Sequence, residues 1–273
     1  MIWASWAVTD VGTVRSANQD TLVDRPDLHV WAVADGAGGH KHGEVASAEL
    51  KATLETLPNI PGADLIPAVR TRVAAVHGDL RRRATEEEVS SGQLVTIAST
   101  LVVFLAQDEH FACLWCGDSR AYLLRHGSMV QLTRDHSLVQ ELVDAGVLAA
   151  ADAERHPQAN VLTRAIGSEG DSPELDKVTG KAEPGDRFLL CSDGLFKALD
   201  ETSIARLASG DDPARRLIDA ALAASARDNV TALIVRAEAP AAIEHEPLWP
   251  LKPFEWDAEP ARQVLLPHPT TRR

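Results

Sequence analysis

The chain has 273 residues, 45% of them hydrophobic, so it is long enough to bury one large core. Its 40 Asp and Glu residues outnumber 27 Lys and Arg, and the formal net charge of −13 would repel the phosphate backbone of a nucleic acid. No apolar stretch approaches the length of a membrane span, and the first residues lack a basic segment followed by an apolar one. We expect a cytoplasmic, monomeric protein with one main domain and neither nucleic acid nor membrane as a partner.

The predicted elements are short strands and amphipathic helices. Apolar and β-branched runs predict strands, in chain order, at 2–8, 30–34, 100–105, 111–116, 121–125, 129–132, 187–191 and 230–236. Apolar residues at helical spacing predict helices within 46–57, 65–80, 138–143 and 214–221. The sequence RHG at 125–127 predicts a hairpin turn between two strands. Because strands cluster and helices come in pairs, this order favours an α+β layered sandwich over alternating βαβ units.

The composition changes near Pro240. From there prolines are frequent and no period of either kind is sustained, so we expect a catalytic or binding domain over 1–238 and a tail over 239–273. Trp249, Phe254 and Trp256 would let this tail dock on the domain or on a partner. A mobile extension is the alternative.

The three cysteines do not form a disulfide framework. Cys113 and Cys116 have the Cys-x-x-Cys spacing of a metal-binding or redox pair, but they lie in a predicted strand. Residues three apart in a strand point to opposite faces, so the two thiols should not share an ion.

The segment VADGAGGH at 33–40 places an acid at the end of an apolar run. A phosphate-binding loop would need a terminal Gly-Lys-Ser/Thr, and a dinucleotide loop needs a different glycine spacing. Two interpretations stay open for Asp35-Gly36 taken alone, namely a hairpin turn and a carboxylate that holds a metal.

Further acids recur at strand ends. Asp193-Gly194 follows a predicted strand, as does Asp118, while Asp228 precedes a strand and Asp20 ends the segment RSANQD. Each acid alone would be an ordinary turn or capping residue. Together they predict a cleft lined by carboxylates, which suits Mg²⁺ or Mn²⁺ better than zinc.

Taken together and in order, the sequence motifs resemble those of a known enzyme family. The chain resembles the metal-dependent serine/threonine protein phosphatases, the type 2C or PPM family, in their bacterial form. The resemblance spans roughly residues 6–236 and lies in the ordered motifs RSANQD, VADGAGGH, GDSRAYLLRHG, LTRDHSLVQELVDAG, LTRAIG, CSDGL and RDNVTALIV.

The resemblance implies a four-layer α-β-β-α sandwich, with two central antiparallel sheets flanked by helix pairs and a metal site at one end. It also implies a role for each motif acid. Asp35 would bridge two ions and Gly36 would offer its carbonyl to the second. Asp193 and Asp228 would complete the first ion, and Asp118 with Asp193 would hold a third, looser ion. Asp20 would orient water, and Arg15 would grip the substrate phosphate.

The implied reaction is hydrolysis of phosphoserine and phosphothreonine in proteins that a serine/threonine kinase has modified. Two bridged Mn²⁺ or Mg²⁺ ions would lower the pKa of a shared water and neutralise the charged transition state. The segment 133–167 would form a flap beside the cleft and shape substrate choice.

Two positions depart from the family pattern, and a nearby histidine pair bears on both the general acid and a zinc site. Gln19 stands where the family often has Glu, which bears on affinity for the second ion. Ala37 stands where animal members have a His proposed as general acid, and His40 is then the nearest candidate for that role. The sequence HKH at 40–42 has no further ligand nearby to complete a zinc site.

Two other functions compete with hydrolysis of phosphoproteins. A pseudophosphatase would keep the fold as a binding module, but a scaffold has no reason to retain uncompensated acids crowded together. A metal-dependent nuclease could use the same acids, although the acidic balance and the lack of a basic groove disfavour it.

Overall fold

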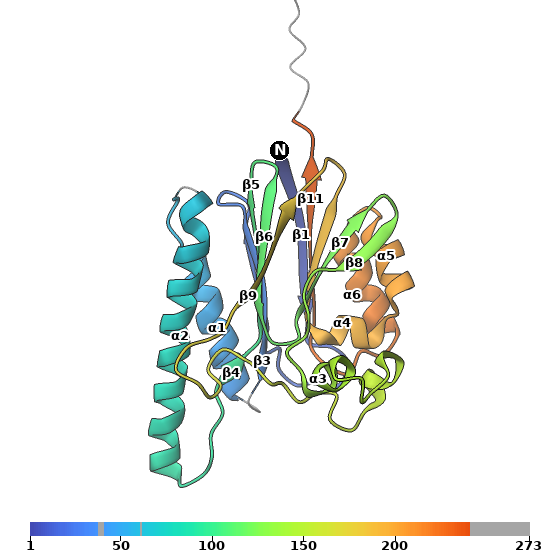
Figure 1. Cartoon of the computed structure of the whole chain (residues 1–273). Helices are drawn as coiled ribbons and strands as arrows, with labels where there is room; N and C mark the ends of the chain where they lie inside the picture. Colours follow the sequence, from blue (N-terminus) through green and yellow to red (C-terminus); the bar gives the residue numbers. More distant parts are fainter. Residues whose placement is uncertain (38–40, 61, 241–273) are drawn as a thin grey trace, which may run out of the picture. The chain divides into compact units, whose positions relative to one another are not determined.

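The computed structural model describes residues 1–37, 41–60 and 62–240. Residues 38–40, which include His40, lie outside the described residues, and so does the predicted tail from residue 241 onward. The described residues form two antiparallel sheets with helices on both outer faces, as Figure 1 shows. The predicted α+β sandwich is confirmed.

Each sheet is built from strands that are distant in sequence. The first sheet has the order β1 (Ile2–Asp10), β11 (Val230–Glu238), β10 (Arg187–Cys191), β7 (Arg120–Arg125) and β8 (Ser128–Gln131). The second has the order β2 (Asp20–Arg25), β3 (Val30–Ala37), β5 (Leu101–Gln107), β6 (His110–Cys116) and β9 (Asp176–Lys181), with β4 (Ala98–Ser99) beside β3. The chain therefore crosses between the sheets several times, and these crossings bring separate motifs to one end.

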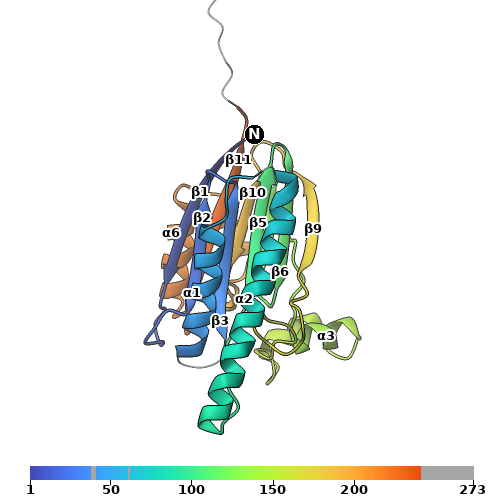
Figure 2. The same cartoon turned by 90° about the vertical axis from the view of Figure 1, so that its left-hand side faces the viewer.

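Helices cover the outer face of each sheet. The second sheet carries α1 (Lys41–Glu55) and α2 (Gly62–Ser91), which run side by side in Figure 2. The first sheet carries α4 (Asp193–Ala198), α5 (Glu201–Ala208) and α6 (Pro213–Ala223). The short helices α3 (Leu138–Asp144) and η1 (Ala150–Arg155) belong to the connection between β8 and β9. In the described part of the chain, no helix is both long and apolar enough to span a membrane.

Three apolar layers separate these four structural layers. One lies between α1, α2 and the second sheet, and another lies between the first sheet and α4–α6. The central layer is rich in aromatic side chains, with the rings of Phe104 and Phe188 from opposite sheets 4.4 Å apart between centroids. Trp3, Trp31 and Phe111 surround that pair. Central strands are buried on both faces, which explains their continuous apolar runs.

The predicted strands and helices are all present, and some elements were missed. Arg125 and Ser128 flank the predicted hairpin turn, whose His126 and Gly127 have φ of 50° and 79°, as in a two-residue turn that matches strand twist. Strands β2 and β9 were not predicted. β9 alternates half-buried and exposed residues at a sheet edge, so its sequence DKVTGK lacks the apolar run of a central strand.

The two cysteines of β6 point to opposite faces, as the strand geometry predicts. Cys113 lies in the central aromatic layer, whereas Cys116 lies in the layer beneath α1 and α2. Burial raises the pKa of both thiols, to about 12 for Cys116, so neither offers a thiolate near neutral pH. The pair is structural.

Replacing Cys113 and Cys116 with serine should therefore affect stability alone. Each buried hydroxyl without a hydrogen-bond partner should lower the free energy of unfolding by about 1–3 kcal/mol. Urea unfolding measures that loss, and metal analysis of the folded double variant should find unchanged bound Mn²⁺. A folded double variant that has lost its Mn²⁺ would contradict the structural role.

Candidate active site

Asp20 and Asp35 lie on neighbouring strands of the second sheet. Asp20 begins β2, Asp35 lies near the end of β3, and the two residues are directly paired in the ladder. Like charges in such a pair repel each other. The buried Asp20 side chain reaches the other sheet, where its Oδ2 accepts hydrogen bonds from Ser192 Oγ at 2.6 Å and Thr231 Oγ1 at 2.7 Å. Asp20 thus joins the ends of the two sheets.

Asp193 and Asp228 come from the first sheet. Asp193 begins α4 shortly after β10, Asp228 lies just before β11, and β10 pairs with β11. Gly194 allows the two segments to approach, because a Cβ at this position would lie 2.0 Å from the carbonyl oxygen of Asn229. Only glycine permits this contact, which brings the two acids to the same end of the sandwich.

Asn229 organises the loop between β1 and β2. Its Nδ2 donates to the carbonyl oxygens of Val11 and Ala17, both at 3.0 Å, and its Oδ1 accepts from the backbone N–H of Gln19 at 2.9 Å. The sequence analysis assigned no role to Asn229, although its place directly after Asp228 was the available indication. The side chain fixes the loop that leads into β2.

Gly36 lies beside Asp35 in a tight backbone contact. Its N–H donates to the carbonyl oxygen of Gln19 at 3.2 Å. A Cβ at Gly36 would lie 2.2 Å from the carbonyl oxygen of Gly43 in the first turn of α1. The Asp35-Gly36 pair is therefore no hairpin turn, because β3 continues to Ala37 and packs against the start of α1.

Asp118 lies in the connection from β6 to β7, where the chain passes from the second sheet to the first. It is buried, and this burial together with the charge of Asp193 raises its pKa to about 7, although the charge of Lys197 opposes the shift. Asp118 thus adds a further costly negative charge to the same region.

The other acids show the same electrostatic strain. Burial, reinforced by the charges of Asp193 and Asp228, raises the pKa of Asp20 to about 7 despite its two hydroxyl donors. Burial also raises the pKa of Asp35 well above its usual range, and the charges of Asp20, Asp193, Asp118 and Asp228 add to the effect. Carboxylates that raise one another's pKa in this way form a region where a cation is strongly stabilised.

Two basic side chains face these acids. Arg15 Nη2 lies 2.8 Å from Asp228 Oδ2, and this pair keeps the Arg15 pKa above its usual value. Lys197 Nζ lies 2.5 Å from Asp193 Oδ2. Burial opposes the charge of Lys197, but the carboxylates of Asp193, Asp118 and Asp35 hold its pKa above the usual value.

The donor set fits a hard divalent cation. Asp20 Oδ1 is buried and has no hydrogen-bond partner among the described residues, and oxygen atoms of crowded carboxylates are the ligands such ions prefer. Within residues 1–37, 41–60 and 62–240, no three Asp, Glu, His or Cys side chains yet converge on one point. In this structure Asp193 Oδ2 contacts Lys197 and Asp228 Oδ2 contacts Arg15.

The predicted flap, 133–167, contains α3 and η1 and is anchored at its base. Arg120 forms a bidentate ion pair with Asp135, at 2.7 Å for the closest contact, and its guanidinium lies 3.6 Å above the ring of Phe196 in α4. Trp115 Nε1 donates to the carbonyl oxygen of Arg134 at 2.8 Å. The flap is thus held against β6 and against β7, whose Arg120 also packs on α4.

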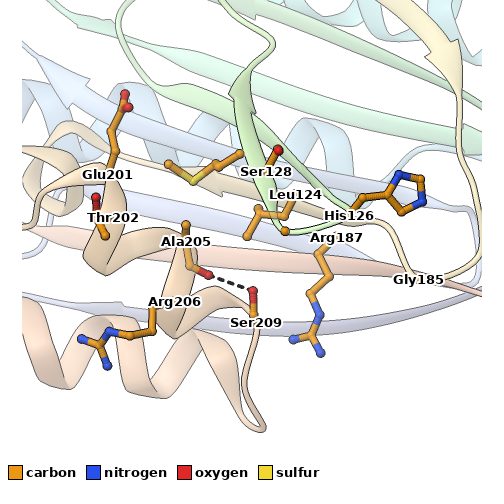
Figure 3. A pocket seen from close by; sticks show the side chains of 12 residues that line it. Leu124, His126, Ser128, Gly185, Arg187, Glu201, Thr202, Ala205, Arg206 and Ser209 are labelled. Atoms are coloured by element: carbon orange, nitrogen blue, oxygen red, sulfur yellow. Dashed lines mark hydrogen bonds between the residues drawn. The ribbon is translucent and has the colours of Figure 1, made fainter.

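A cavity of about 660 Å³ lies elsewhere, between the β7–β8 hairpin and α5 (Figure 3). Its lining includes Arg187, the first residue of β10, whereas Asp193 lies two residues beyond the last residue of that strand. The acids therefore lie at the other end of β10 from this cavity, and the cavity contains none of the predicted site residues.

Of the two histidines in HKH at 40–42, only His42 belongs to the described residues. His42 Nε2 lies 3.1 Å from Glu87 Oε1 on α2, so this ring faces α2. His40, the candidate general acid, lies outside the described residues.

A family model for protein phosphatase 2C matches residues 13–229, a range that contains every predicted site residue. The chain belongs to the protein phosphatase 2C family. The serine/threonine protein phosphatase PstP of Mycobacterium tuberculosis is 36% identical over 232 residues, which are 84% of this chain and 44% of PstP. The chain thus spans less than half the length of that relative.

Two more comparisons cover nearly all of the matched protein. The serine/threonine phosphatase Stp of Listeria monocytogenes is 32% identical over 239 residues, 83% of this phosphatase 2C chain and 93% of Stp. The crystal structure of the PstP catalytic domain in complex with two manganese ions matches with a TM-score of 0.75 and 32% identity, covering 87% of this chain and 99% of that one.

The crowding of the acids predicts an unusual stability effect. Asp118→Asn removes a buried charge, so without metal it should raise the midpoint of thermal unfolding by several degrees at pH 8. Because the raised pKa keeps Asp118 protonated in the folded protein at pH 5, the gain should shrink there. Calorimetry in chelator measures both values.

Asp135→Asn is the matched control, because Asp135 is also buried but pairs with Arg120. Its midpoint should fall, since Arg120 would lose a charged partner. Equal losses in the two variants would show that Asp118 carries no excess negative charge.

Proposed function

We propose that this chain is a metal-dependent protein serine/threonine phosphatase that acts on phosphoproteins. The observation that carries the proposal is the gathering of acids from both sheets at one end of the sandwich, where burial and mutual repulsion raise the pKa values of Asp20, Asp35 and Asp118. The names of the Mycobacterium and Listeria relatives support the substrate class.

We assign the acids to a centre for Mn²⁺ or Mg²⁺. Asp35 would bridge two ions, the Gly36 carbonyl would serve the second, and Asp193 and Asp228 would complete the first. The manganese complex of the PstP catalytic domain supports two ions of this kind. Oxygen-rich, sulfur-free ligand sets are typical of these cations.

Bound divalent cations would lower the pKa of a water and neutralise the charge of the phosphoryl group. Asp20 would orient that water, because its Oδ1 is buried and has no hydrogen-bond partner among the described residues while Oδ2 is held by two hydroxyl groups. Arg15 would bind the phosphate oxygens through its planar guanidinium. Its side chain is 54% exposed, so it can exchange Asp228 for a substrate phosphate.

The pseudophosphatase alternative has less support. A binding module would gain stability by replacing the buried acids with neutral residues, yet all five motif acids are present. Ala37 provides no proton for the leaving oxygen, which would take it from water or from another residue.

We also propose that residues 1–238 suffice for catalysis, because every assigned residue precedes Asn229. The physiological phosphoprotein, the tail over 239–273, the monomeric state and the cytoplasmic location stay predictions from the sequence.

Phosphate release from a phosphothreonine peptide tests the proposed function. The wild type should hydrolyse the peptide with Mn²⁺ and lose activity in chelator. Asp193→Asn and Asp228→Asn should each reduce kcat by roughly 100-fold or more, because they weaken the first ion, while Arg15→Ala should act chiefly on KM.

Asp219→Asn is the control, because Asp219 is an exposed acid of α6 that pairs only weakly with Arg215. It should behave as the wild type does. Undiminished hydrolysis in chelator, or wild-type rates for both Asp193→Asn and Asp228→Asn, would overturn the assignment.

Gln19 gives a separate prediction. Its backbone is fixed by Asn229 and by Ser47 Oγ, which donates to the Gln19 carbonyl at 2.6 Å, so a substitution should change the side chain without moving the strand. Gln19→Glu would add a full negative charge near the second ion and should lower the half-saturating Mn²⁺ concentration. Titration of activity against free Mn²⁺ checks this, and a higher half-saturating concentration would show that residue 19 faces away from the ions.

A further inference from the structure

Lys197 occupies a central place between the acids and the flap. Its Nζ lies 2.5 Å from Asp193 Oδ2 and 2.6 Å from Asn160 Oδ1. Asn160 belongs to the flap segment 133–167, whereas Asp193 and Lys197 belong to α4. One ammonium group thus contacts both a proposed metal ligand and the flap.

This contact differs from an ordinary pair of residues four apart on a helix. Such pairs at the surface contribute little. Here the side chains of Lys197 and Asp193 are only 31% and 14% exposed, and the third partner comes from a distant part of the chain. The charge of Lys197 also acts on buried Asp118.

The space beside Lys197 is small. Asp118 and Lys197 line a cavity of about 40 Å³, together with Gln140, Glu154 and Phe196. Lys197 therefore borders the same cavity as Asp118 while its ammonium group contacts Asp193.

We propose that the Lys197 ammonium takes the place that a third divalent ion would have between Asp118 and Asp193, and that it ties the flap to the site through Asn160. This inference rests on the proposed two-ion centre. An ammonium offers three donors and a single positive charge, so it can satisfy Asp193 Oδ2 and Asn160 Oδ1 at once. A second cation of higher charge cannot share that oxygen without strong repulsion.

The consequence is a flap whose attachment does not depend on the concentration of free metal. A loosely bound ion dissociates when free metal is scarce, whereas the Lys197 side chain is covalently part of the protein and cannot dissociate. Lys197 is then a positioning residue, which acts on the reaction through Asp193 and Asn160 without touching the substrate.

Counting bound ions tests the inference without relying on activity. Purified full-length wild type, Lys197→Met and Lys197→Asp are dialysed against Mn²⁺, and bound Mn²⁺ is quantified by electron paramagnetic resonance. The wild type should bind two ions. Lys197→Met should gain a third site at least about tenfold tighter than any extra binding by the wild type, and Lys197→Asp should bind it more tightly still.

Lys181→Met is the matched control, because Lys181 pairs with the exposed Glu109 at 2.7 Å and lies at the end of β9. It should bind as the wild type does. Three bound ions in the wild type, or only two in both folded Lys197 variants, would overturn this inference and leave the proposed two-ion centre intact. A wild type that binds no Mn²⁺ would overturn the proposed metal centre as well.

Limited trypsin digestion gives an independent readout of the flap. Arg155 is an exposed cleavage site within it. Lys197→Met in chelator and Asn160→Ala should both be cut there faster than the wild type, although Asn160→Ala should still bind only two ions. Wild-type cleavage rates in both variants would contradict a tie between Lys197 and the flap.

Discussion

Repulsion among carboxylates gathered at one end of the two sheets is the constraint on which the rest of the site depends. Strand pairing places Asp20 directly opposite Asp35, and the other sheet adds Asp193 and Asp228. Folding must hold these charges together at a cost in free energy. Basic partners offset part of that cost, and the remainder creates the affinity for divalent cations that the proposed chemistry needs.

The sandwich can bear this cost because its three apolar layers are extensive and well packed. The aromatic layer around Phe104 and Phe188 joins the two sheets, and Asp20 links their ends by hydrogen bonds to Ser192 and Thr231. Close backbone contact at Gly194 then leaves no freedom in the spacing of α4 and β11. The acids are held by the frame of the fold, whereas the flap is held at its ends by backbone hydrogen bonds of His136 and Ile166 and elsewhere by side chains.

The sequence predicted much of this arrangement because the relevant patterns are local. Continuous apolar runs mark the buried strands, and the acids at their ends mark the site. β2 and β9 escaped prediction, since edge strands with polar residues lack that pattern. The contacts of Asn229 and Lys197 were not predicted either, because their partners Val11, Ala17 and Asn160 are brought near only by the tertiary structure.

The most direct test is the location of manganese in a crystal of the full-length chain grown with Mn²⁺, from anomalous scattering at the manganese edge. Our account predicts two peaks bridged by Asp35, with Asp193 and Asp228 on one of them, and Lys197 Nζ in contact with Asp193 where a third peak would otherwise lie. Absence of manganese from the acids, or ions that do not touch Asp35, would contradict the proposed metal centre.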